Sequence, residues 1–206
     1  INAVEQFQAE YTVFKGATMV GNAVLSMTAN KDAVLWQLET KPSGIFILLT
    51  SKKPFSESVM HKTENEFRLA STLIAHRRND APHETAHFDL QQQQVEVFAE
   101  GQYKRYPLES AVYDYLSIHW LAANMTQNKD RQIEFDFYRR AKITRSKLRL
   151  VAQSELEIDG KTRGVRCYVQ TFQSSSSKYR YCYDLDNPLL PLEIENTKPG
   201  RDPSTI

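Results

Sequence analysis

The sequence predicts a mainly β protein, in which a strongly curved antiparallel sheet or an open β-barrel wraps around one α-helix. Apolar and polar residues alternate with a period of two along most of the 206 residues, which is the pattern of half-buried strands. Turn-forming pairs such as Lys15-Gly16 and Asn187-Pro188 separate these segments. About ten successive strands tend to curl, because a flat sheet of that size leaves its edges and one face uncovered.

The predicted strands follow one another closely, as in an antiparallel meander. In the first of them Phe7, Ala9, Tyr11 and Val13 alternate with polar residues. The predicted ranges are 7–13, 19–27, 34–40, 67–76, 95–99, 131–137, 142–158, 163–172, 178–183 and 192–196. No linker divides them, so we expect a single β-rich domain over residues 1–206, with flexible extreme termini.

One segment has helical rather than alternating periodicity. Between residue 110 and about residue 124 the apolar positions with helical spacing are Val112, Tyr115, Leu116, Ala122 and Ala123. Ser110 or Asp114 is available as the N-cap. We expect the apolar side of this helix to pack into the concave face of the sheet. His119 lies on that side and is expected to be a hydrogen-bonded core histidine rather than a metal ligand.

The charge balance argues against a nucleic-acid binder. The chain has 26 basic and 25 acidic residues, so its overall electrostatic field is weak. Its longest apolar run, residues 45–49, is far shorter than the roughly 20 residues of a membrane-spanning helix. We therefore expect neither a nucleic-acid partner nor a transmembrane segment, and no cofactor motif is recognisable.

The two cysteines, Cys167 and Cys182, indicate the compartment. A two-residue turn at Ser174-Ser175 places them opposite each other across a β-hairpin, within disulfide reach. A turn that uses all four serines would offset them, and two buried free thiols remain the alternative. A disulfide indicates an oxidising compartment, so we expect a periplasmic protein. We expect its signal peptide to have been removed, since no basic and apolar leader is visible.

Several short motifs, in order, resemble a known family. They are Glu10-Tyr11-Thr12-Val13, Val20-Gly21-Asn22-Ala23, Phe88-Asp89-Leu90, Asp114-Tyr115-Leu116-Ser117 and Leu190-Pro191-Leu192-Glu193-Ile194-Glu195. Together they resemble the bacterial exported envelope family catalogued as domain of unknown function 3108. The resemblance implies export to the cell envelope, and it supplies no established catalytic residues that could be carried over to this chain. Tyr181-Cys182-Tyr183 stands where that family often has a tryptophan, so the cysteine pair looks like a local addition.

Residues 83–87 match the zinc-peptidase pattern H-E-x-x-H. On a helix, His83 and His87 would bind zinc and Glu84 would activate a water molecule. The following residues read as strand, however, and residues four apart on a strand are separated by about 13 Å. We expect a strand here, and the alternative function is a zinc-dependent hydrolase.

A basic stretch over residues 139–149 carries six positive charges and no negative one. In strand geometry Arg145, Lys147 and Arg149 share one face. That face is expected to be solvated, or to bind an anionic partner such as a lipid, a glycan or an acidic protein.

The function that these patterns favour is non-catalytic binding. An apolar concave face closed by a helix suits a lipid-like ligand or a segment of an envelope protein partner. The apolar run that follows Gly44 is either a buried strand or a ligand-contacting loop, and the tyrosines of the last hairpin are either core or pocket lining. The candidate ligand-binding residues are Ile45, Phe46, Tyr115, Leu116, His119, Tyr168 and Tyr181.

Overall fold

Two meanders of strands make up the fold. The computed structural model describes residues 5–44, 54–64, 66–158 and 160–206. The first meander contains β1 (Glu5–Lys15), β2 (Thr18–Ala29), β3 (Ala33–Pro42), β4 (Phe55–Lys62), β5 (Phe67–Ala75), β6 (Glu84–Asp89), β7 (Gln94–Ala99) and β8 (Gln102–Pro107). The second contains β9 (Val112–Tyr113), α2 (Ile118–Asn128), β10 (Gln132–Arg139), β11 (Lys142–Ile158), β12 (Lys161–Phe172), β13 (Ser175–Asp184), β14 (Pro191–Lys198) and β15 (Arg201–Thr205).

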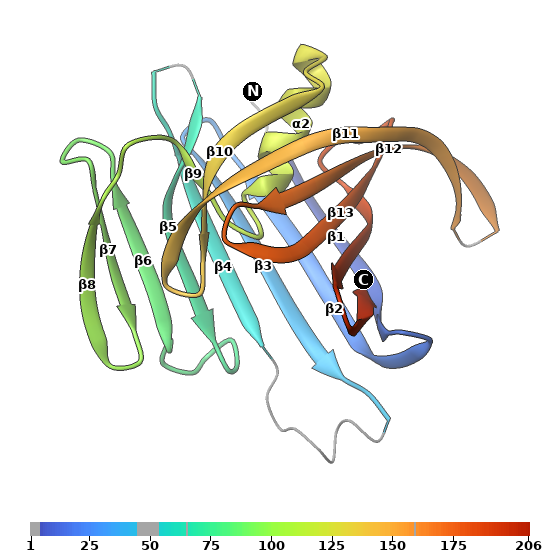
Figure 1. Cartoon of the computed structure of the whole chain (residues 1–206), viewed down its shortest axis with the longest axis horizontal. Coiled ribbons are helices and arrows are strands. Elements are labelled where there is room, and N and C mark those ends of the chain that lie inside the picture. Colours follow the sequence, from blue (N-terminus) through green and yellow to red (C-terminus); the bar gives the residue numbers. More distant parts are fainter. Residues whose placement is uncertain (1–4, 45–53, 65, 159) are drawn as a thin grey trace.

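The two meanders join into one 15-stranded sheet within the described residues. Its order is β8-β7-β6-β5-β4-β3-β2-β1-β15-β14-β13-β12-β11-β10-β9. The seam between the meanders is short, with Phe14 opposite Thr205 and Lys15 opposite Ser204. Beyond the seam the second meander curls over the first, so that β10 to β13 cross in front of the first strands (Figure 1). The predicted class, a mainly β and strongly curled open sheet with a helix, is therefore confirmed.

The concave side of the curled sheet holds the main core. Successive strand residues point to opposite faces, so Leu25, Met27 and Ala29 of β2 are all buried on this side. The helix α2 contacts both meanders from within the core. The ring of its His119 lies 5.4 Å from that of Trp36 on β3 and 5.9 Å from that of Tyr181 on β13.

The helix differs from its predicted range, which was wrong at the amino-terminal end. Residues 112–113 form β9 and pair in parallel with β10, and α2 begins only at Ile118. Asp114 explains the delay, because its side chain accepts hydrogen bonds from the backbone N–H groups of Leu116 (3.1 Å) and Ser117 (2.8 Å) in a turn before the helix. At the other end Lys129 adopts a left-handed conformation and terminates α2. Among the described residues no helix is long and apolar enough to cross a membrane.

All ten predicted strands are present, and the structure adds others. The strand expected at residues 83–87 is β6, which begins at Glu84. Strands β4, β8, β9 and β15 were not predicted. β8 and β15 are mostly exposed and have no buried face to impose an alternating pattern. In β4 a bulge between Val59 and Met60 shifts the alternation.

The hairpin of β12 and β13 carries the disulfide. Cys167 and Cys182 are bonded and lie directly opposite each other, and Tyr168 lies opposite Tyr181, as predicted. The turn itself differs, because it uses Gln173 and Ser174, and a bulge after Thr171 restores the expected register. The cysteines form a small apolar cluster on the face opposite the tyrosines.

Candidate ligand-binding site

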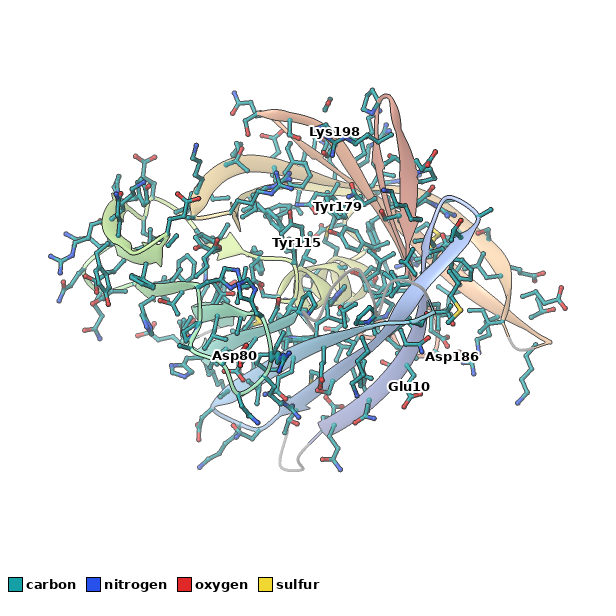
Figure 2. The ribbon with its side chains drawn as sticks, turned by 90° about the horizontal axis from the view of Figure 1, so that it is seen from below. Glu10, Asp80, Tyr115, Tyr179, Asp186 and Lys198 are labelled. Atoms are coloured by element: carbon teal, nitrogen blue, oxygen red, sulfur yellow. A yellow bond between two sulfur atoms is a disulfide. The ribbon has the colours of Figure 1, made fainter. Side chains whose placement is uncertain are left out.

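An apolar cavity of about 180 Å³ lies between the two meanders and α2. Its lining comes from β1, β2, β3, the turn before α2, α2 itself, β13, β14 and the chain end, and consists of Tyr11, Leu25, Leu38, Tyr115, Leu116, His119, Tyr179, Tyr181, Ile194 and Ile206. Figure 2 shows Tyr115 and Tyr179 next to each other in the interior, where their ring centres are 5.5 Å apart.

One wall of the apolar cavity is a ladder of tyrosines on β13. Tyr179, Tyr181 and Tyr183 stack on one another because residues two apart share a strand face, with ring centres 6.1 and 6.4 Å apart. The hydroxyl of Tyr181 donates to the side-chain oxygen of Gln170 at 2.8 Å. The hydroxyl of Tyr181 therefore has its hydrogen-bond partner within the protein, and its aromatic ring is the part that faces the cavity.

His119 of α2 also lines the apolar cavity, next to the tyrosine ladder, and carries no charge at neutral pH. Its side chain is buried, and its Nδ1 hydrogen-bonds with the hydroxyl of Tyr183 at 2.9 Å. Burial lowers the pKa of this imidazole from 6.5 to about 3. His119 is thus a hydrogen-bonded core histidine, as expected, and it also borders the cavity.

Two tyrosines that line the apolar cavity, Tyr11 and Tyr115, are also neutral. Burial raises the pKa of Tyr11, and its hydroxyl donates to the carbonyl oxygen of Pro191 at 2.7 Å. Burial likewise raises the pKa of Tyr115, with a smaller contribution from neighbouring Tyr179. A chamber with neutral walls suits an uncharged, apolar group.

Four of the predicted binding residues meet at this cavity: Tyr115, Leu116, His119 and Tyr181. Tyr168 does not line it, because its ring is fully buried in the core and its hydroxyl pairs with that of Thr126 on α2 at 2.8 Å. Ile45 and Phe46 lie outside the described residues.

Sequence reasoning missed much of the lining, including Leu25, Leu38, Ile194 and Ile206. The alternating pattern indicates that residues such as Leu25 face inward. It carries no information on which inward residues border an unfilled volume, because that depends on the strands facing them.

The H-E-x-x-H stretch does not form the helix that a zinc peptidase needs. Glu84 and His87 belong to β6, and His83 directly precedes it. On a strand the two histidines are about 13 Å apart, too far to share one ion. His83 instead stacks on His76 with ring centres 4.5 Å apart, and Glu84 accepts a hydrogen bond from the backbone of Ala141. No group of three possible metal ligands occurs in the described part of the chain.

The predicted basic face exists on β11, but acidic residues of β10 neutralise part of it. Lys147 pairs with Glu134 at 3.3 Å, and Arg145 pairs with Asp136 at 3.4 Å. Arg149 is exposed on the same face, opposite Gln132. Because two of its three cations have partners, this face is weaker as an anionic docking surface than the sequence suggested.

Comparison with known proteins gives a match at the level of fold. No protein-family model matches the chain, and no curated protein matches it. A search of solved structures finds similarity to the crystal structure of a beta-barrel-like protein of domain of unknown function DUF1849 from Brucella abortus. The match has a TM-score of 0.62 at 8% sequence identity and covers 100% of this chain and 95% of that chain. This chain is therefore similar in fold, over its whole length, to a beta-barrel-like protein.

Proposed function

We propose that this protein is an exported envelope protein that binds a lipid-like ligand in the apolar cavity and does not catalyse a reaction. The observation that carries the proposal is the cavity itself, a hollow of about 180 Å³ whose walls are aliphatic and aromatic. Binding sites for small molecules are typically concave, mostly apolar and already formed in the free protein. An apolar chain that enters this cavity would be removed from water and would not contact a charged side chain.

The chemistry of the walls supports binding rather than catalysis. A general base works best when its pKa is near the working pH. The imidazole of His119, with a pKa of about 3, is a poor base at neutral pH. The hydroxyls of Tyr11 and Tyr181 are both engaged in hydrogen bonds with other parts of the protein.

The disulfide supports the proposed export. Disulfides persist in oxidising compartments such as the periplasm and are rare in the cytosol, and Cys167 and Cys182 are bonded and fully buried here. The resemblance of several motifs to domain of unknown function 3108 agrees with an envelope location, and we propose membership of that family on those motifs.

Binding of a neutral single-chain probe tests the proposal. Octyl glucoside titrated into the protein should give saturable heat and a shift in tyrosine and tryptophan fluorescence. Replacing Leu38 by tryptophan fills the cavity from β3, where the leucine is only partly buried, and should weaken binding by about tenfold or more. Leu90→Trp is the matched control, since Leu90 is 40% exposed and does not line the cavity.

Ile194→Phe, which fills the same cavity from β14, serves as a second variant if Leu38→Trp does not fold. The absence of saturable binding to the wild type would refute the proposal. Unchanged affinity in a folded cavity-filled variant would refute it as well.

A further inference from the structure

A second hollow, of about 630 Å³, adjoins the apolar cavity and has a different chemistry. It lies among the end of β1, the turn between β10 and β11, and the ends of β13, β14 and β15. Its charged lining residues are Lys15, Arg139, Arg140, Lys198, Arg201 and Asp202. We call it the basic pocket, since five of its charged lining residues are basic and one is acidic.

The two hollows are neighbours on one continuous surface. Tyr179 lines both of them. On β13, Tyr181 lies on the apolar side of Tyr179 and Ser177 on the basic side, all three on the same strand face. The inner face of β13 therefore changes from apolar to polar at Tyr179.

Strand β14 repeats this change beside β13. Ile194 lies opposite Tyr181 and lines the apolar cavity, whereas Asn196 lies opposite Tyr179 and lines the basic pocket. Lys198, two residues further along the same face, completes the progression. Figure 2 shows Tyr115, Tyr179 and Lys198 in succession from the interior toward the edge. The concave face is thus amphipathic along the strand direction.

The cations of the basic pocket lack the acidic partners found on the outer face of β11. Within the described part of the chain, none of the five forms an ion pair at 4.0 Å or less. Arg139 is held over the ring of Phe172 at 4.5 Å. One terminal nitrogen of Arg139 is buried without a hydrogen-bond partner among the described residues.

A bound anion would pair with these cations and would give the buried Arg139 nitrogen a hydrogen-bond acceptor. Converging cations of like charge repel one another, and a concave site of one sign concentrates counter-ions. A buried guanidinium nitrogen without an acceptor is costly, and a phosphate or carboxylate oxygen is the acceptor that guanidinium groups bind best.

We propose that the ligand is an anionic amphiphile, with its phosphate or carboxylate head group in the basic pocket and one apolar chain passing Tyr179 into the apolar cavity. This inference rests on the function proposed above and adds the class of ligand. A cavity of about 180 Å³ is smaller than the roughly 300–1,000 Å³ of usual ligand pockets. It fits one slender chain, and the larger basic pocket fits the head group.

Three probes test this inference: octyl phosphate, octyl glucoside and inorganic phosphate. Octyl phosphate should bind at least about tenfold more tightly than either of the other two, because it alone occupies both hollows. Its affinity should fall as the ionic strength rises, since Lys198 and Arg201 are exposed and screened by salt.

The double variant Lys198→Glu with Arg201→Glu should separate the two hollows. Both residues are exposed at the end of the β14–β15 hairpin, so the fold should tolerate the change. Its affinity for octyl phosphate should fall by about tenfold or more, while its affinity for octyl glucoside stays within about twofold. Lys31→Glu is the matched control, because Lys31 is an exposed lysine in a turn outside the basic pocket.

The outcomes distinguish this inference from the proposed function. Equal affinity for octyl phosphate and octyl glucoside would refute the anionic head group and leave lipid-like binding intact. Inorganic phosphate binding as tightly as octyl phosphate would show a plain anion site and refute the amphiphile. Failure of both octyl probes to bind would refute the proposed function itself.

Discussion

Buried His119 should make the stability of the fold depend on pH. Its side chain is 1% exposed, and burial lowers its pKa from 6.5 to about 3. In the unfolded chain the imidazole is hydrated and keeps a pKa of about 6.5. Between these two values the unfolded state binds more protons than the folded state. The contribution of neutral His119 is therefore complete above about pH 6.5 and is lost progressively as the pH falls toward 3.

The size of the effect follows from the pKa shift. Each pH unit within this window changes the free energy of unfolding by about 1.4 kcal/mol for one group. Acidification from about pH 6.5 to about pH 4.5 should therefore cost roughly 3 kcal/mol through His119 alone. That is a large part of the 5–15 kcal/mol that is usual for a folded domain.

Urea unfolding of the wild type and of His119→Asn, at about pH 7.5 and about pH 4.5, isolates this contribution. Asparagine can still hydrogen-bond to Tyr183 but does not titrate, so the stability advantage of the wild type should shrink by roughly 3 kcal/mol at the lower pH. His87→Asn is the control, since His87 is exposed on β6 and the same substitution there removes no buried imidazole. An advantage that is the same at both pH values would refute the reasoning, because the imidazole would then be able to charge in the folded state.

Three further predictions concern stability. Reducing the bond between Cys167 and Cys182, which are separated by 15 residues, should lower the free energy of unfolding by about 3 kcal/mol, and two free thiols in the oxidised protein would contradict the pairing. Leu116→Ala should cost about 2–5 kcal/mol in urea unfolding because Leu116 is 3% exposed, whereas Leu90→Ala, at 40% exposure, should cost less than about 0.5 kcal/mol. Gly21→Ala should cost roughly 1–3 kcal/mol, since its Cβ would lie 2.4 Å from a backbone oxygen of β3; an unchanged melting temperature would show that the strands separate freely there.

Local geometry made most strands and the disulfide predictable. Alternation is a property of the extended backbone itself, so Phe7 to Val13 could be read as a strand without its neighbours. The pairing of Cys167 with Cys182 depended on hairpin register, which a turn between adjacent strands sets. A bulge moved the turn to Gln173 and Ser174 and still left that register unchanged.

The start of the helix was not predictable from periodicity. The apolar spacing from Val112 onward fits a helix, yet Val112 and Tyr113 pair with β10. The competing interaction is a long-range strand contact, combined with the turn made by Asp114. Helical spacing reports only which residues would share a face, and a tertiary contact overrode it.

The basic pocket shows most clearly what the sequence alone left undecided. Arg139 and Arg140 belong to the basic run recognised in the sequence, but Lys15 lies more than a hundred residues before them and Lys198 far after them. The pairing of Lys15 with Ser204, at the seam of the two meanders, brings these distant cations to one pocket.

The sequence by itself determined the class of fold, the alternating inner and outer faces and the facing cysteines, because each of these depends on residues close together in the chain. Only the tertiary structure decided that β1 and β15 join, that the second meander curls over the first, and that Tyr179 lies between an apolar cavity and a basic pocket. The physical reason is that a cavity is the volume left unfilled by side chains from distant strands, and that volume depends on how those strands pair and cross.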